Sequence, residues 1–222
     1  MVDQVDLRLY AIVDPEHTGG HGLVDLARAV AAGGATLVQL RDKHGSTRAM
    51  VDVARALRGT LEPAGVPLLI NDRVDVALAA EADGVHIGQN DMSAADARLL
   101  LGRTAIVGLS LSTVQQAQAA PLDLLDYVGI GAVFATGSKD DATAPIGVSG
   151  LRDIVQAVRA RKPGFPICGI SGINAGNAAE TIAAGADGVA VISALSLASD
   201  PAKAAQELRA VVDGALRRRG PP

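Results

Sequence analysis

The feature that most constrains this fold is a series of eight short apolar runs separated by longer, Ala-rich stretches with helical periodicity. Parallel strands that helices cover on both faces consist almost entirely of apolar residues, as these runs do. Eight strands that are each followed by a helix predict an α/β fold, a single closed (β/α)₈ TIM barrel. An open doubly wound sheet is the structural alternative, but it would normally have fewer strands and no eighth unit. The predicted strands are Arg8–Val13, Thr36–Leu40, Pro67–Ile70, Gly84–His86, Ile106–Leu109, Tyr127–Ile130, Ile167–Gly169 and Gly188–Val191.

The stretches between the apolar runs have the residue spacing of amphipathic helices. A chain of 222 residues fits one barrel better than two domains, so we expect a single domain over 1–222. Its last residues, 217–222, read Arg-Arg-Arg-Gly-Pro-Pro and are expected to form a disordered tail. The predicted helices include Leu23–Ala32, Thr47–Leu61, Ala94–Leu101, Gly150–Arg161, Asn174–Ala184 and Ala202–Arg218.

One phrase occurs twice, in Ala79–Val85 and in Ala183–Val189, where a helix end turns into a strand. We interpret both copies as turns at the bottom of the barrel, where packing and stability dominate.

The composition excludes several classes of protein. Aromatic residues make up 2% of the chain and the net charge is −4, which argues against nucleic-acid binding by base stacking or by a basic field. The single cysteine, Cys168, excludes an intramolecular disulfide and is expected to be a buried, unreactive hydrophobe. We find no signal peptide and no apolar run of about 20 residues, so we expect a soluble cytoplasmic protein. The sequence leaves the oligomeric state open, and a homo-oligomer is one of the alternatives.

Polar and charged residues follow nearly every predicted strand, at the end of the barrel where such proteins place their sites. Arg41 and Lys43 follow the second strand and Lys139 follows the sixth. Asp72 and Asp91 follow the third and fourth strands, and Mg²⁺ prefers carboxylate oxygens completed by phosphate and water. Cations and a divalent metal in one mouth predict a diphosphate ligand.

The ends of the seventh and eighth strands predict a second, monophosphate site. Gly172 allows close approach of backbone to an anion, and Asn174 is expected to cap the following helix. Loops seven and eight are the usual phosphate-binding place of these barrels. The mouth is therefore expected to hold two phosphorylated small molecules.

Each of these signals has a purely structural alternative. Asp72 alone could be a turn residue or a helix cap, and Arg41 and Lys43 could be solvated loop charges. Alternation along an extended segment, however, points Arg41 and Lys43 to the same side as Gln39. His86 is either an acid or base or simply a hydrogen-bonding side chain, and we assign it no catalytic role. No glutamate stands where a barrel isomerase would place its general base.

Five segments in this order resemble the thiamine-phosphate synthase family over about Tyr10 to Leu195. The resemblance implies a (β/α)₈ barrel that uses Mg²⁺. It implies condensation of 4-amino-2-methyl-5-hydroxymethylpyrimidine diphosphate with 4-methyl-5-(2-phosphoethyl)thiazole, or its carboxylated form. The products are thiamine phosphate and diphosphate, formed through a dissociative step with a cation-like pyrimidine. The segments are Gln39–Lys43, Asn71–Arg73, His86–Asp91, Thr136–Lys139, and Gly172 with Ile192-Ser193.

The resemblance also implies roles for individual residues. Gln39 should contact the pyrimidine, and Asp72 and Asp91 should ligate Mg²⁺. Lys43, Ser110 and Lys139 are the residues expected to act in catalysis. The residues expected to hold the diphosphate are Arg41, Lys43, Asn71, Ser110 and Lys139. Those expected to hold the thiazole phosphate are Thr136, Ser138, Gly172, Ile192 and Ser193, and Leu40, Asp42 and Gly137 complete the substrate-binding segments.

The sequence departs from the family pattern at three places: Ala132 replaces a proline, Ser138 a threonine and Ser171 a glycine. Two rival functions share the barrel. A thiazole tautomerase is expected to have a histidine just after the fifth strand, where this chain has Ser110-Leu111-Ser112-Thr113. A non-catalytic thiazole-phosphate-binding barrel should have lost Asp72, Asp91 or Lys139, and all three are present.

Overall fold

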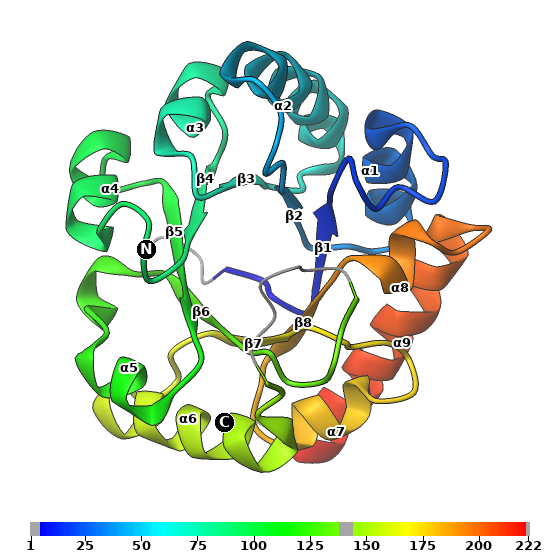
Figure 1. Ribbon diagram of the computed structural model, residues 1–222. Coiled ribbons are helices and arrows are strands. Elements are labelled where there is room, and N and C mark those ends of the chain that lie inside the picture. Colours follow the sequence, from blue (N-terminus) through cyan, green and yellow to red (C-terminus); the bar gives the residue numbers. More distant parts are fainter. Residues whose placement is uncertain (1–4, 138–143, 221–222) are drawn as a thin grey trace.

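The computed structural model describes residues 5–137 and 144–220, and within them eight parallel strands pair in chain order. Strand β1 also pairs with β8, so the sheet closes into a barrel with the helices around its outside (Figure 1). The predicted (β/α)₈ barrel is thus confirmed. The strands are β1 Leu9–Val13, β2 Leu37–Leu40, β3 Leu68–Asn71, β4 Gly84–Ile87, β5 Ile106–Leu111, β6 Tyr127–Ile130, β7 Ile167–Ile170 and β8 Gly188–Val191.

The helices follow the predicted order, with differences at their ends. The longer ones are α1 Leu23–Ala32, α2 Thr47–Leu61, α4 Ala94–Leu101, α6 Gly147–Arg161 and α9 Pro201–Arg219. The shorter ones are α3 Val74–Ala80, α5 Val114–Ala119, α7 Ala178–Ala183 and α8 Ser193–Ser196, with single 3₁₀ turns at Glu62–Ala64 and Leu122–Leu124. No helix among the described residues is both long and apolar enough to traverse a lipid bilayer.

Helix α7 begins later than predicted, and Asn174 does not cap it. The Asn174 side chain instead accepts a hydrogen bond from the Gly176 amide at 2.8 Å, within a turn that precedes the helix. The Asn177 side chain accepts from the Asn174 amide and donates to the Gly172 carbonyl. These short bonds hold residues 174–177 in turns, so the helix starts only at Ala178.

The C-terminal helix continues into the tail that we predicted to be disordered, and for residues 217–219 that prediction is wrong. The Arg219 guanidinium donates to the carbonyl oxygens of Ile182 and Ala186 and pairs with Asp187 at 2.8 Å. These contacts tie the last turn of α9 to the end of α7. Residues 221–222 lie outside the described residues.

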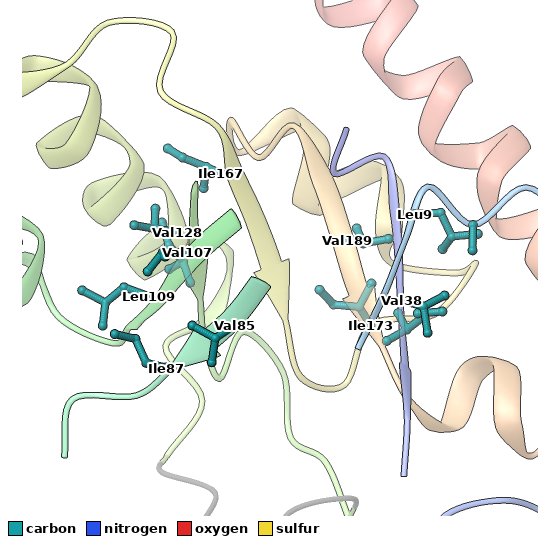
Figure 2. Close-up of a cluster of buried hydrophobic side chains, with 14 of the residues drawn as sticks. Leu9, Val38, Val85, Ile87, Val107, Leu109, Val128, Ile167, Ile173 and Val189 are labelled. Atoms are coloured by element: carbon teal, nitrogen blue, oxygen red, sulfur yellow. The ribbon is translucent and has the colours of Figure 1, made fainter. Parts of the chain in front are cut away.

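The period-two alternation of the strands divides the core into two parts. Outward-facing residues such as Val38, Val107 and Val189 pack between sheet and helices, as Figure 2 shows. Inward-facing residues fill the barrel itself: Leu7, Tyr10, Ile12, Leu37, Leu69, Tyr127, Cys168, Ala190 and Ile192. Full burial of a large apolar side chain contributes about 1.5–3 kcal/mol, so this packed interior stabilises the scaffold below the mouth.

The bottom of the barrel repeats one connection at alternate strands. Asp83, Asp126 and Asp187 each precede a strand and accept a hydrogen bond from an amide at the start of the preceding strand, at 2.7, 2.8 and 3.0 Å. Arg98 and Arg159 neutralise the second and third of these carboxylates. The repeated phrase in the sequence is therefore a structural turn, as predicted.

Candidate active site

A cavity of about 350 Å³ opens at the C-terminal end of the barrel. Seven residues that we singled out from the sequence line it: Gln39, Arg41, Lys43, Asn71, Asp72, Asp91 and Ser110. Its other lining residues are Ile12, His86, Gly88, Gln89, Asn90 and Ile170. We call this the mouth cavity. Its walls come from the ends of β1 to β5 and β7, so segments far apart in the sequence meet there.

The end of β2 carries the predicted same-side triplet. Gln39 is 2% exposed and its amide donates to the Tyr10 hydroxyl, while Arg41 is ion-paired with the buried Asp14. Lys43, farther out, donates to Asp72 at 2.5 Å. One carboxylate occupies only part of a guanidinium, which has five N–H donors, so Arg41 can still donate into the cavity.

Two neighbours in the same segment do not line the cavity. Leu40 has the opposite parity and is buried in the outer core. The Asp42 carboxylate accepts hydrogen bonds from the amides of His44 at 3.0 Å and Gly45 at 2.7 Å. Asp42 thus shapes the loop after β2, and neither side chain is among the groups that face the mouth cavity.

Asp72 and Asp91 face the cavity from adjacent loops. Partial burial raises the pKa of the Asp72 carboxyl above its ordinary value, the nearby Asp91 raises this pKa further, and the Lys43 ammonium opposes both. One Asp91 oxygen accepts from the Gly88 amide at 2.8 Å. Two carboxylates that disfavour each other's charge in a half-buried site fit a divalent cation, which would relieve that repulsion.

No group of three or more His, Cys, Asp or Glu side chains suited to a metal lies within residues 5–137 and 144–220. Mg²⁺ often binds through only one or two carboxylates and takes its other ligands from phosphate and water. The residues present therefore fit a Mg²⁺ ion that arrives with a phosphorylated ligand, and they do not form an all-protein cage.

A second, smaller cavity lies beside the first, and Ile170 lines both. Thr136, Gly172, Ile192 and Ser193, all predicted to hold a phosphate, line this phosphate cavity. Its volume is about 20 Å³, close to the space that one water needs. A phosphate ester must therefore sit at its rim or widen it. Gly137 is exposed beside Thr136, and Ser138 and Lys139 lie outside the described residues.

The loop after β7 has two consecutive residues with left-handed backbone. Ser171 has φ 78° and Gly172 has φ 67°. A side chain on Gly172 would place its Cβ 2.4 Å from the Ala135 carbonyl oxygen, so no larger residue fits there without a shift. The glycine that the family resemblance implies at position 171 would match the left-handed backbone, and Ser171 adopts it nonetheless.

Sequence reasoning missed three polar residues that the structure joins to this site. Asp14 positions Arg41, and the buried Tyr10 and Tyr127 hydroxyls lie 2.9 Å apart. Burial raises the pKa of both tyrosines far above the usual value, so both stay protonated. His86, for which the sequence left a hydrogen-bonding role open, bonds to the Tyr127 hydroxyl and to Ser110. One signal could have found Tyr10. It lies two residues before Ile12 in the same strand, so both side chains point to the same face of the sheet.

Two wider hollows lie at the opposite end of the barrel, lined by strand starts and bottom turns. Several of their charged residues form ion pairs: Asp6 with Arg8 at 2.5 Å, and Asp187 with Arg159 and Arg219. We therefore assign these hollows to the end of the barrel that serves stability, and place the candidate functional residues in the mouth cavity.

Comparison with known proteins agrees with this geometry. A family model described as thiamine monophosphate synthase matches residues 9–195. The thiamine-phosphate synthase of Moorella thermoacetica is 50% identical over 204 residues, which cover 92% of this chain and 95% of the relative. That of Agrobacterium fabrum is 46% identical over 220 residues, 99% of this chain and 100% of the relative.

A solved structure shares both fold and sequence with this chain. The thiamine phosphate pyrophosphorylase of Pyrococcus furiosus superposes with a TM-score of 0.82 at 37% identity, over 96% of this chain and 98% of that one. The match with this enzyme and the matches with the curated relatives span nearly all of the barrel described above. The chain belongs to the thiamine-phosphate synthase family.

Proposed function

We propose that the protein condenses 4-amino-2-methyl-5-hydroxymethylpyrimidine diphosphate with 4-methyl-5-(2-phosphoethyl)thiazole, or its carboxylated form, with Mg²⁺ as cofactor. The family relationship makes it a transferase of thiamine biosynthesis. In this proposal the diphosphate and pyrimidine bind in the mouth cavity and the thiazole phosphate binds at the phosphate cavity. The site of action we propose is the cytoplasm.

The observation that carries the proposal is that two cavities with different chemistry share one wall at Ile170. The larger has cations and two carboxylates, which suit a diphosphate with its metal. The smaller has a left-handed Gly172 and the start of α8, where the first helical amides have no partner within the helix. Two reactants held side by side need little further loss of freedom to react.

The proposed first step is departure of the diphosphate, which is driven by neutralisation of its negative charge. Bound Mg²⁺ would supply a Lewis acid that stabilises the leaving diphosphate. Arg41, held by Asp14, and Lys43 would donate to diphosphate oxygens, and Ser110 would donate its hydroxyl. Lys43 would first exchange its Asp72 partner for the ligand. Lys139 is proposed for the same task, from its place in the sequence alone.

The second proposed step is attack of the thiazole nitrogen on the pyrimidine methylene carbon from which the diphosphate departs. One C–O bond breaks with its electron pair on diphosphate, and one C–N bond forms from the nitrogen lone pair. For the thiazole itself no proton has to move, which agrees with the lack of a glutamate among the described residues that line the mouth cavity. The carboxylated form would in addition release CO₂ and take up one proton at the ring carbon that carried the carboxylate.

The test is to incubate the purified protein with both substrates and Mg²⁺ and to follow thiamine phosphate by fluorescence after oxidation. Product that disappears with EDTA, and in an Asp91→Ala variant that is still folded, is the expected result. A folded protein that makes no product would contradict the proposal. Thiazole tautomerisation without metal would then be assayed, and binding of the thiazole phosphate without turnover would indicate a non-catalytic barrel.

A further inference from the structure

A continuous chain of hydrogen bonds runs through the barrel from one predicted ligand contact to another. The Gln39 amide nitrogen donates to the Tyr10 hydroxyl, which lies 2.9 Å from the Tyr127 hydroxyl. The Tyr127 hydroxyl lies 2.7 Å from His86 Nδ1. His86 Nε2 lies 2.8 Å from Ser110 Oγ. Gln39 and Ser110 both line the mouth cavity, whereas Tyr10 and Tyr127 are 1% and 0% exposed.

The barrel is built around this chain. A Cβ on Gly108 would lie 2.1 Å from the Tyr127 ring, and one on Gly129 would lie 3.2 Å from the His86 ring. The His86 and Tyr127 rings stack with centroids 5.5 Å apart. Glycines on β5 and β6 thus leave the space that the two rings fill, and the rings cannot easily turn away from their partners.

Each member of the chain can donate in only one direction at a time. A phenol has one O–H, and a neutral imidazole has one donor and one acceptor nitrogen. If Gln39 donates to Tyr10, then Tyr10 donates to Tyr127, Tyr127 to His86 Nδ1, and His86 Nε2–H to Ser110. The Ser110 hydroxyl hydrogen is then left to donate into the cavity, and Gln39 Oε1 faces the cavity as an acceptor.

The reverse order has the opposite consequence at both ends. If Ser110 donates to His86, the chain runs back to Tyr10, whose hydrogen must be accepted by Gln39. The amide then turns over and presents its NH₂ group to the cavity, while Ser110 offers only lone pairs. One mixed order leaves the Tyr10 hydroxyl hydrogen without an acceptor, and the other brings the two tyrosine oxygens together at 2.9 Å with no hydrogen between them. Both are unfavourable. The two ends are therefore coupled.

We propose that this chain is a specificity device, in which an anion bound to Ser110 fixes Gln39 with its carbonyl oxygen toward the ring of the same ligand. A phosphate oxygen only accepts hydrogen bonds, so it selects the order that ends on a donating Ser110. Gln39 then favours a ring with an exocyclic amine over its oxo counterpart. Tyr10, Tyr127 and His86 are positioning residues for this selection. The choice of ring rests on the function proposed above.

The first test reads the direction of the chain without turnover. The chain has four histidines, so ¹⁵N spectra of histidine-labelled protein are simple, and a His86→Gln variant assigns the His86 signals. With Mg²⁺ and inorganic diphosphate bound, His86 should be the tautomer protonated at Nε2 only. An Nδ1–H tautomer or a doubly protonated ring would overturn the proposal.

The second test compares two matched variants that each remove one buried hydroxyl. In Tyr127→Phe the Tyr10 hydrogen has only Gln39 left as an acceptor within the described chain, so the amide should turn over. The kcat/KM ratio of the amino pyrimidine diphosphate to its 4-oxo analogue should then fall at least about tenfold from the wild-type value. Tyr10→Phe leaves Gln39 without this partner and forces neither orientation, so its ratio should fall less.

A merely structural role for the tyrosines would lower activity with both substrates alike. A ratio that stays at the wild-type value in both variants would therefore overturn the proposal. Intrinsic reactivity differs between the two substrates, but it cancels when ratios are compared between variants. Wild-type turnover of the amino substrate separately decides the proposed function, so the two failures are distinguishable.

Discussion

Asp72 combines three properties at a single residue of the candidate site. Its backbone is left-handed, with φ 61°, its carboxylate pairs with Lys43, and Asp91 lies close enough to raise its pKa. Asparagine tolerates left-handed backbone better than most residues, so Asp72→Asn removes the charge and keeps the geometry. Asp72 is thus a place where charge and backbone conformation can be tested separately.

We expect Asp72→Asn to abolish Mg²⁺-dependent activity without destabilising the fold. A carboxyl whose folded-state pKa is raised is destabilising when ionised, so at neutral pH its loss should leave the free energy of unfolding unchanged or raise it by up to about 1 kcal/mol. Urea unfolding without metal measures this. Asp75→Asn, which breaks an exposed pair with Arg73 outside the mouth cavity, is the control and should retain activity.

The left-handed pair after β7 gives a second prediction at this scale. Relief of left-handed strain gains about 1–2 kcal/mol and the extra freedom of glycine in the unfolded chain costs about 0.4–1 kcal/mol. Ser171→Gly should therefore stabilise the protein by about 0–1.5 kcal/mol in chemical unfolding. Gly172→Ala should destabilise the protein by about 2 kcal/mol or more, because the added Cβ would meet the Ala135 carbonyl oxygen. A clear loss of stability in Ser171→Gly would contradict this account.

How far the site could be predicted depended on residue parity. Gln39, Arg41 and Lys43 stand at alternate positions of one strand end, and the structure places all three on the mouth cavity. Leu40 has the other parity and faces the helices. Asp14 could not be assigned, because its role is an ion pair with a residue 27 positions away, which no local pattern encodes.

At the scale of elements, long periodic segments were predictable and short connecting ones were not. The bounds of α1 and α2 match the prediction, because each is a sustained amphipathic run, and the bounds of α4 match as well. Helix α7 is six residues long, and local Asn174 and Asn177 bonds delay its start. The end of α9 was mispredicted because its order comes from tertiary contacts that three consecutive arginines do not reveal.

The C-terminal arginines offer a matched pair for testing this ordering. Arg219→Ala should destabilise the protein by about 1–3 kcal/mol, because it removes two bonds to carbonyls and a half-buried ion pair. Arg218→Ala, an exposed change in the same helical turn, should stay within about 0.5 kcal/mol of wild type. Equal effects in urea unfolding would show that α9 frays before Arg219. Neither change should alter kcat, since both lie at the bottom of the barrel.

At the scale of the whole molecule, the closed barrel separates stability from chemistry. The repeated Asp turns and paired charges occupy its lower end, while unequal loops bring cations and carboxylates to the upper end. The closed sheet was predictable because eight strand–helix units leave few other arrangements. The size of the phosphate cavity was not, since it depends on how loops six to eight pack against one another.

The two-carboxylate site predicts that Mg²⁺ and diphosphate stabilise the molecule together and only weakly apart. Asp72 and Asp91 supply too few ligands to hold Mg²⁺ tightly, and diphosphate alone would face their negative charge. Ligand binding stabilises by RT ln(1 + [L]/Kd), about 2.7 kcal/mol at one hundred times Kd. For a domain of this size we expect a Tm rise of roughly 5–10 °C with both ligands, measured by thermal unfolding.

Each ligand alone should shift Tm by less than about 2 °C, and Asp72→Asn should abolish the joint shift. The joint shift should also weaken in acid, because protons compete with the metal for a carboxyl whose pKa is raised. Without ligands the sign reverses at this residue: protonation of Asp72 favours the folded state, so its own contribution to stability increases as the pH falls through the raised pKa. A full Tm shift with Mg²⁺ alone would instead require a complete protein cage for the metal, and would contradict the shared site.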